Sequence, residues 1–132
     1  MNREILFRGK AIDNGEWVYG YLTKHYYKGE FEFCIQYFDS DMDDKKRHNV
    51  IVDQNTIGQF TGLFDKNGVK IFEGDIVKSH SKNWIGEIKF FEGSFIHNEA
   101  IRANSLINDC VPTYCEVIGN IHDNPTLLKA EV

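Results

Sequence analysis

The sequence predicts a mainly β protein made of small antiparallel barrels, with an SH3-like C-terminal part and one possible short helix. Aromatic residues make up 14% of the chain, and they suit the pleated, half-buried surface of a strand. Glycine (11 residues) far exceeds proline (2 residues). Short apolar runs alternate with glycine-bearing turns at intervals of roughly 8–12 residues, which is typical of barrels and sandwiches rather than of βαβ units.

The N-terminal half reads as hairpins. Apolar and alternating residues at 4–13 and 16–24 flank Asp13-Asn14-Gly15, and an Asn-Gly between two such runs is a strong hairpin signal. Residues 31–38 predict a third strand and residues 50–52 a return to the sheet. The segment between them, residues 39–49, is polar and charged throughout, and we expect an exposed loop there.

The most patterned stretch, "FTGLFDKNGVKIFEGDIV" at residues 60–77, poses the question of whether it marks a ligand site or only turns of a sheet. Gly68 and Gly74 suit positive-φ turn positions, and Asn67 and Asp75 can bind turn amides. We therefore interpret the stretch as hairpins, with strands at 56–64, 69–72 and 76–80. Its apolar residues are expected in the core: Phe60, Leu63, Ile71, Phe72, Ile76 and Val77.

Further strands are predicted at 84–91, 94–98 and 114–121. Residues 98–109 show rough helical spacing with Asn98 as a candidate cap, and Asn124-Pro125 predicts one helical turn within 123–132. The whole chain, residues 1–132, is predicted to be a single domain. Its N-terminal part (1–73) would hold the hairpins and the charged loop, and its C-terminal part (74–132) the SH3-like barrel.

Composition also bears on location and partners. The formal net charge is −5, which disfavours sequence-independent nucleic-acid binding without excluding it. The N-terminus is charged and no apolar run approaches the ~20 residues needed to span a bilayer. Cys34, Cys110 and Cys115 form an odd set without regular spacing, so we expect free thiols in a reducing, cytoplasmic compartment.

No motif for chemistry stands out. The five histidines and three cysteines lack close metal-ligand spacing, and the calcium-like Asp39, Asp41 and Asp43 lack the Gly and Glu that such a loop needs. Neither Cys34 nor Cys110 has a local activator, although a triad assembles in space and a sequence cannot rule one out. We therefore expect no catalytic residue, no metal and no cofactor, and we rank an enzyme as the least favoured reading.

One stretch indicates an interaction surface, although its pattern is not specific. In "WVYGYLTKHYYKG", residues 17–29, aromatic residues are interleaved with basic ones. Such a stretch can stack nucleobases and hold phosphates. The same pattern more often packs a core on one face of a strand and covers a subunit interface on the other. Both readings stay open, and the candidate interaction surface comprises Trp17, Tyr19, Lys24, His25, Tyr26, Tyr27 and Trp84.

Four segments carry a family resemblance: "FRGKAIDNGEWVYGYL", "TIGQFTGLFDKNGVKIFEGDIV", "GEIKFFEGSF" and "EVIGNIHDNPTLL". Together they resemble the YopX family of phage and prophage proteins over nearly the whole chain, apart from residues 25–50 and 97–113. The resemblance implies a small, mostly β, oligomeric protein encoded by a bacteriophage or prophage. It carries no activity and no catalytic residue.

These observations favour an accessory protein that acts by protein–protein contact, with itself as a homo-oligomer and with host or phage proteins. The alternative is a nucleic-acid-binding β-barrel module.

Overall fold

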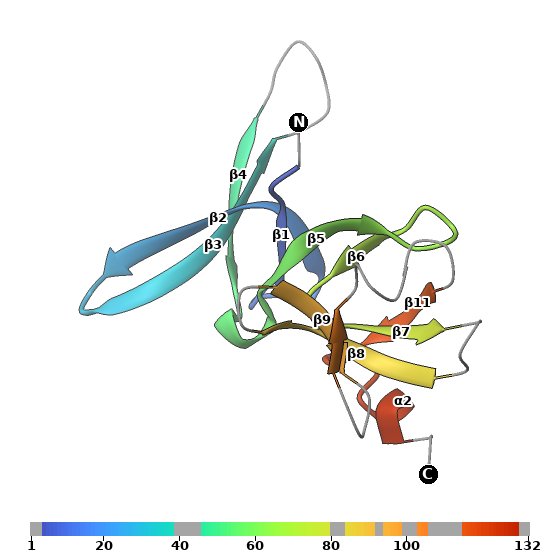
Figure 1. Cartoon of the computed structure of the whole chain (residues 1–132). Helices are drawn as coiled ribbons and strands as arrows, with labels where there is room; N and C mark the ends of the chain where they lie inside the picture. Colours follow the sequence, from blue (N-terminus) through green and yellow to red (C-terminus); the bar gives the residue numbers. More distant parts are fainter. Residues whose placement is uncertain are drawn as a thin grey trace. The chain divides into compact units, whose positions relative to one another are not determined.

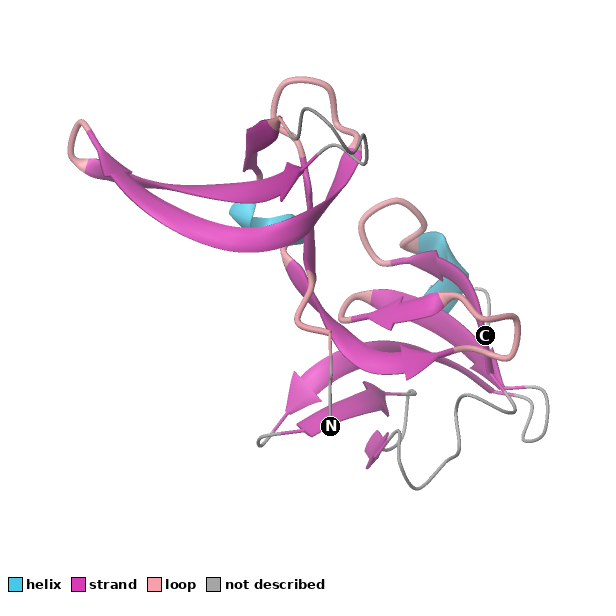
Figure 2. Cartoon of the chain, turned by 90° about the horizontal axis from the view of Figure 1, so that it is seen from above, coloured by secondary structure: helices cyan, strands magenta, loops and turns pink. Residues whose placement is uncertain are grey.

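The structure is a computed structural model that describes residues 4–38, 46–79, 84–91, 94–98, 103–105 and 115–129. Nearly all the described elements are strands, which confirms the mainly β class (Figure 2). The chain divides into two compact units, residues 1–59 and residues 60–132. In the described residues, no helix is long and apolar enough to cross a membrane.

The first unit is an antiparallel sheet in the order β4-β3-β2-β1. Its strands are β1 (Phe7–Lys10), β2 (Trp17–Tyr27), β3 (Glu30–Phe38) and β4 (Arg47–Val52). A 3-10 turn, η1 (Gln54–Thr56), follows β4. The next strand, β5 (Gly58–Phe64), begins in this unit, where Gly58 and Gln59 pair with β1.

Residues with positive φ values form the turns of both hairpins in this unit. At the predicted Asn-Gly turn, Gly15 has a φ of 70°, and its N–H donates to the carbonyl of Ala11 at 2.8 Å. Lys28 and Gly29 join β2 to β3 with φ values of 51° and 82°, the positive values that two-residue hairpin turns require. β2 and β3 pair from Tyr21↔Gln36 to Tyr27↔Glu30, so this long hairpin continues beyond the paired part of β1 (Figure 1).

The second unit contains the rest of β5, which pairs with β6 (Lys70–Phe72), and a five-stranded antiparallel sheet in the order β10-β9-β8-β7-β11. The strands of this sheet are β7 (Asp75–Ser79), β8 (Trp84–Phe91), β9 (Ser94–Asn98), β10 (Ala103–Ser105) and β11 (Cys115–Asn120). The short helix α2 (Thr126–Lys129) follows β11 and confirms the helical turn predicted there.

The predicted core of residues 60–77 is confirmed. Phe60, Phe72, Ile71, Ile76 and Val77 are buried. Ile71 and Val77 form a cluster with Ile88 and Cys115, and Leu63 packs against it. The patterned stretch is therefore structural, since most of its apolar residues lie in the core and turns join its strands, while Phe64 and Val69 are exposed.

One side chain organises the turn inside this stretch. Asp65 is buried, and one of its carboxylate oxygens accepts the N–H groups of Asn67 at 2.8 Å and Val69 at 2.9 Å. Its other oxygen accepts the N–H of Val117 in β11 at 3.0 Å. Asp65 is therefore an acceptor of turn amides, and the backbone N–H of Asn67 is one of its donors. The predicted role of the Asn67 side chain stays a prediction.

The other turn predictions are confirmed. Gly68 and Gly74 have φ values of 83° and 93°, and the carboxylate of Asp75 accepts the N–H of Phe72 at 2.7 Å. The Gly74 N–H donates to the carbonyl of Ile88 at 2.9 Å, and its carbonyl accepts from Ile121 at 2.9 Å. The turn is thus bonded to the middle of β8 and to the residue that follows β11.

Three expectations need correction. In the described residues, strand pairing closes neither unit into a barrel. In the first unit the residues that follow β1 meet the end of β4 at the isolated bridge Ala11↔Val52, after which the chain turns into η1. In the second unit β10 and β11 are the two edge strands of the five-stranded sheet. The SH3-like assignment of this unit stays a prediction.

The other two corrections concern single segments. Residues 47–49 lie in β4 and not in a loop, because they pair with residues 36–38 of β3. Residues 103–105 form β10 and not a helix, because their backbone pairs with β9. The remainder of both predicted segments, residues 39–45 and most of 98–109, lies outside the described residues.

Candidate interaction surface

The register of the first unit assigns its side chains to two faces. Directly paired residues of antiparallel strands point to the same side, and successive residues alternate. Because Tyr21 pairs with Gln36 and Cys34 pairs with Ile51, the odd-numbered residues of β2 and β4 share a face with the even-numbered residues of β3. The opposite face carries the buried Ile35 and Val52.

The first of these faces exposes a group of large apolar side chains, which we call the aromatic face. Tyr19, Tyr21 and Tyr27 of β2 are 46%, 57% and 57% exposed. Phe38 of β3 and Ile51 of β4 are 49% and 43% exposed. A contiguous exposed apolar patch is unusual on a monomer and commonly marks an interaction site.

Cations border the aromatic face near β1. The guanidinium carbon of Arg8 lies 4.6 Å from the centre of the Trp17 ring, and the Lys10 ammonium lies 5.7 Å from it. Both basic residues are on the same face as Trp17, since Lys10 pairs with Trp17 and Arg8 pairs with Tyr19. Trp17 is half-buried, so it contributes less exposed surface to the aromatic face than the tyrosines do.

Two of the predicted surface residues lie on the opposite face. The Lys24 ammonium is 4.2 Å from the centre of the Phe31 ring, and Tyr26 makes an edge contact with the same ring at 5.1 Å between centroids. Tyr26 and Phe31 are strongly exposed, so the end of the hairpin shows aromatic rings on both faces. The sequence stretch 17–29 is therefore divided by strand alternation and does not form a single surface.

The remaining predicted residues separate further. His25 is exposed on the aromatic face, where its Nε2 lies 3.0 Å from the hydroxyl of Thr23. Trp84 is the first residue of β8 in the second unit and pairs with Ser79. Its side chain lies outside what the structure describes, so its place in the predicted surface stays a prediction.

The candidate surface predicted from the sequence contains only part of the aromatic face. Tyr21 was recognisable, because it alternates with Tyr19 along a predicted strand. Phe38 and Ile51 gave no such signal, since apolar residues in strands usually pack in a core. Only the pairing of three strands shows that their side chains are exposed beside the tyrosines.

Cys34, which the sequence offered as a candidate nucleophile, lies in β3. Burial, followed by the charge of Glu32, raises the pKa of the Cys34 thiol, which keeps it protonated and poorly nucleophilic. Cys34 and Cys115 are free and buried, while Cys110 lies outside the described residues. Within the part of the chain that the structure describes, no three His, Cys, Asp or Glu residues gather to hold a metal ion.

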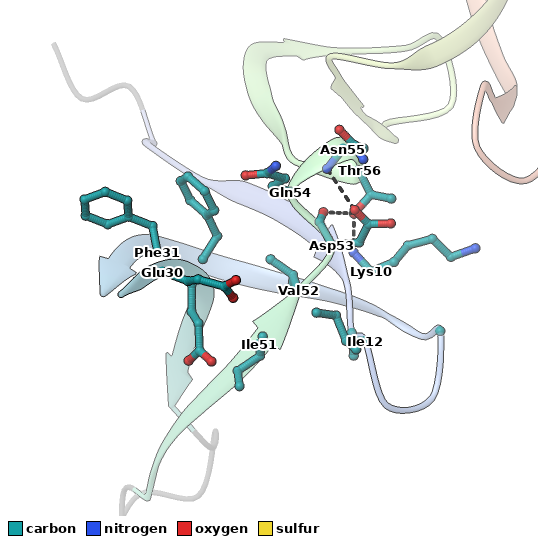
Figure 3. Close-up of a pocket in the computed structure, with 14 residues that line it drawn as sticks. Lys10, Ile12, Glu30, Phe31, Ile51, Val52, Asp53, Gln54, Asn55 and Thr56 are labelled. Carbon is teal, nitrogen blue, oxygen red and sulfur yellow. Dashed lines mark hydrogen bonds between the residues drawn. The ribbon is translucent and has the colours of Figure 1, made fainter. Parts of the chain in front are cut away.

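A groove lies in the same unit, beside the end of β4. It has a volume of about 740 Å³ and is lined by residues of β1, β3, β4 and η1, among them Phe31, Glu32 and Asp53 (Figure 3). Its floor is held by Thr56, whose hydroxyl donates to the Asp53 carbonyl at 2.6 Å and accepts the Lys10 N–H at 2.9 Å.

Comparison with known proteins agrees with this architecture. The crystal structure of protein EF1440 from Enterococcus faecalis is similar, with a TM-score of 0.63 and 25% sequence identity. The similarity covers 96% of this chain and 99% of that one. No curated protein matches. A model of the YopX protein family matches residues 6–129, nearly the whole chain, and the protein therefore belongs to the YopX family.

Proposed function

We propose that this protein is a non-enzymatic accessory protein of a bacteriophage or prophage that acts by protein–protein contact in the host cytoplasm. In this proposal it self-associates through the aromatic face. The observation that carries the proposal is the exposure of Tyr19, Tyr21, Tyr27, Phe38 and Ile51 on one face of a sheet. The phage or prophage setting rests on the family resemblance alone.

An open strand edge supports self-association. β1 pairs only with residues 17–20 of β2, so among the described residues the outer part of β2, from Tyr21 to Tyr27, has β3 as its one strand neighbour. Edge strands expose backbone donors and acceptors that a second chain can pair with. A second copy could therefore extend the sheet at β2 and cover its tyrosines together.

The paired substitution Tyr21→Lys and Tyr27→Lys is expected to weaken self-association at least about ten-fold, because charges replace apolar contacts on the face and edge. Sedimentation velocity over a range of protein concentrations measures this. The matched control is Ile5→Lys with Val69→Lys, since both residues are exposed, at 58% and 49%, and lie outside the aromatic face. A wild-type protein that stays at 15.3 kDa at high concentration contradicts self-association.

A specific observation also keeps a nucleic-acid-binding function as the second candidate. Tyr19 and Tyr21 are exposed beside Trp17, over which the Lys10 ammonium lies, and aromatic rings next to cations stack bases and hold phosphates. Arg8 also lies over Trp17 but is buried. The net charge of −5 opposes this reading.

This second function predicts that a fluorescent single-stranded oligonucleotide binds at low salt and dissociates steeply as salt rises. Fluorescence anisotropy measures the binding. Tyr19→Ala with Tyr21→Ala should weaken it about ten-fold, whereas Tyr26→Ala, on the opposite face, should not. No anisotropy change with any oligonucleotide at low salt would remove this candidate.

A further inference from the structure

The groove of the first unit lies where β3 continues past the end of β4. The last residue of β4, Val52, pairs with Phe33, and the chain then leaves the sheet at Asp53. The first three residues of β3, 30–32, therefore have β2 as their one strand neighbour in the described part of the chain. The structure thus leaves a gap in the sheet that is open to a short extended segment.

The turn that ends β4 is held in place. The Asp53 side chain caps η1 by accepting the Asn55 N–H at 3.0 Å, and its backbone N–H donates to the Lys10 carbonyl at 2.9 Å. Figure 3 shows Asp53, Asn55 and Thr56 on one side of the groove and Phe31 and Glu30 on the other. Asp53 accepts hydrogen bonds from both Asn55 and Thr56. A preformed groove of this kind lowers the ordering cost of binding.

The walls of the gap differ in chemistry on the two faces of the sheet. Phe31 and Phe33 lie on the face that also carries Val52, and the Lys24 ammonium contacts both of their rings, at 4.2 and 5.6 Å. Glu30 and Glu32 lie on the other face with Ile51. Of the residues lining the groove, Glu30, Glu32 and Asp53 carry carboxylates and Lys10 carries an ammonium, so acidic groups predominate.

We propose that this groove binds an extended segment of a partner protein in which apolar residues alternate with lysine or arginine. The segment would add a short strand to the free edge of β3 at residues 30–32. Its apolar side chains would then meet Phe31 and Phe33, beside the buried Val52. Its basic side chains would lie on the opposite face, next to Glu30 and Glu32. The period of two matches the alternation of side chains along a strand.

The negative charge of Glu30 and Glu32 disfavours two competing occupants of the groove. A nucleic acid or an acidic peptide would bring negative charge to the carboxylates of Glu30 and Glu32. A segment with its basic residues in the other register would place them beside Lys24 instead. The proposal concerns a different strand edge from the self-association of β2, although Glu30, Glu32 and Ile51 lie on the same face of the sheet as the tyrosines.

The first probe is an acetylated peptide of alternating valine and lysine, Val-Lys-Val-Lys-Val, titrated into the full-length, ¹⁵N-labelled protein. Amide shifts are expected at residues 30–33 and 52–56, which line the gap. The acidic analogue Val-Glu-Val-Glu-Val should not bind. The analogue Val-Lys-Pro-Lys-Val keeps the charge but lacks a backbone donor, and it should bind several-fold more weakly because proline cannot complete the ladder.

The second arm changes the protein. Glu30→Gln with Glu32→Gln removes two charges from the gap and is expected to weaken binding of the lysine peptide at least about five-fold. The matched control is Glu116→Gln with Asp123→Asn, which changes the net charge equally but lies in the second unit.

Three results would overturn the proposal. One is the absence of shifts with the lysine peptide, and another is equal binding of its proline analogue, which would leave only a charge effect. The third is shifts at 30–33 that grow with protein concentration alone, which would identify a second copy as the occupant. Since the self-association test uses tyrosine variants and particle mass, the two proposals fail by different measurements.

Discussion

Replacing Asp65 with alanine is expected to lower the free energy of unfolding by about 3 kcal/mol, because it removes the acceptor of three backbone N–H groups. Asn67 and Val69 lie in the same turn, but Val117 lies 52 residues further along the chain. The carboxylate therefore ties the turn to β11. The neighbouring Lys66 N–H donates to the Cys115 carbonyl at 3.0 Å and strengthens the same connection.

The more conservative change Asp65→Asn should cost about 2 kcal/mol, for a geometric reason. An amide keeps one oxygen, which can accept either from Asn67 and Val69 or from Val117, whereas the carboxylate serves both sides. Chemical denaturation measures the loss, and hydrogen exchange at the Val117 amide should quicken. The matched control is Asp13→Asn, which changes an exposed carboxylate and should shift stability by no more than roughly 0.5 kcal/mol.

The pH dependence tests the same carboxylate. Burial alone would raise the pKa of Asp65, but the N–H donors of Val117, Val69 and Asn67, together with the charge of Lys66, outweigh it and hold the pKa below its ordinary value. Its contribution is therefore fully present above the unfolded pKa of about 3.9 and is lost as pH falls through the folded pKa.

The stability gap between the wild-type protein and Asp65→Asn should thus narrow as the pH is lowered from neutral into the acidic range. The pKa of Glu87 is shifted in the opposite direction to that of Asp65. Burial, opposed by Lys89 and reinforced by Glu73, raises its pKa, so its charged form disfavours folding and its protonation at lower pH restores stability. Glu87 is present in both proteins, and its effect cancels in the difference. A gap that is constant with pH would contradict the role given to Asp65.

Replacing Gly20 with alanine is expected to destabilise the first unit by about 3 kcal/mol, because no room exists for a methyl group. Gly20 is buried in β2, and a Cβ there would contact the backbone carbonyl oxygen of Gln36 and lie 3.2 Å from a methyl carbon of Ile35. A backbone oxygen cannot rotate away as a side chain can. The paired strands would have to separate to admit the methyl group.

Gly15→Ala provides the control, since it separates a steric cost from a conformational one. A Cβ at Gly15 meets nothing within 4 Å, but its φ of 70° disfavours alanine. We expect a loss of about 1 kcal/mol there. Urea denaturation compares the two variants in a Trp84→Phe background, where fluorescence reports Trp17, which lies in the same unit. Equal losses at both positions would show that crowding at Gly20 is not the cause.

The sequence by itself determined the local structure and the family. Alternating apolar residues and turn glycines are local signals, so the hairpins at Gly15 and Gly68 and the core residues of 60–77 followed from them. The YopX assignment followed in the same way, from four contiguous segments. The weak helical spacing of residues 98–109 failed because pairing of residues 103–105 with β9 outweighs a marginal helix propensity.

Tertiary structure alone decided which side chains act together. Strand alternation divides the aromatic stretch 17–29 between two faces, and β3 and β4 add Phe38 and Ile51 to one of them. The acceptor role of Asp65 for Val117 and the groove at the end of β4 likewise depend on contacts between distant residues. Register and the length of each strand are settled only when strands pair, because a shift of one residue reverses which face every side chain occupies.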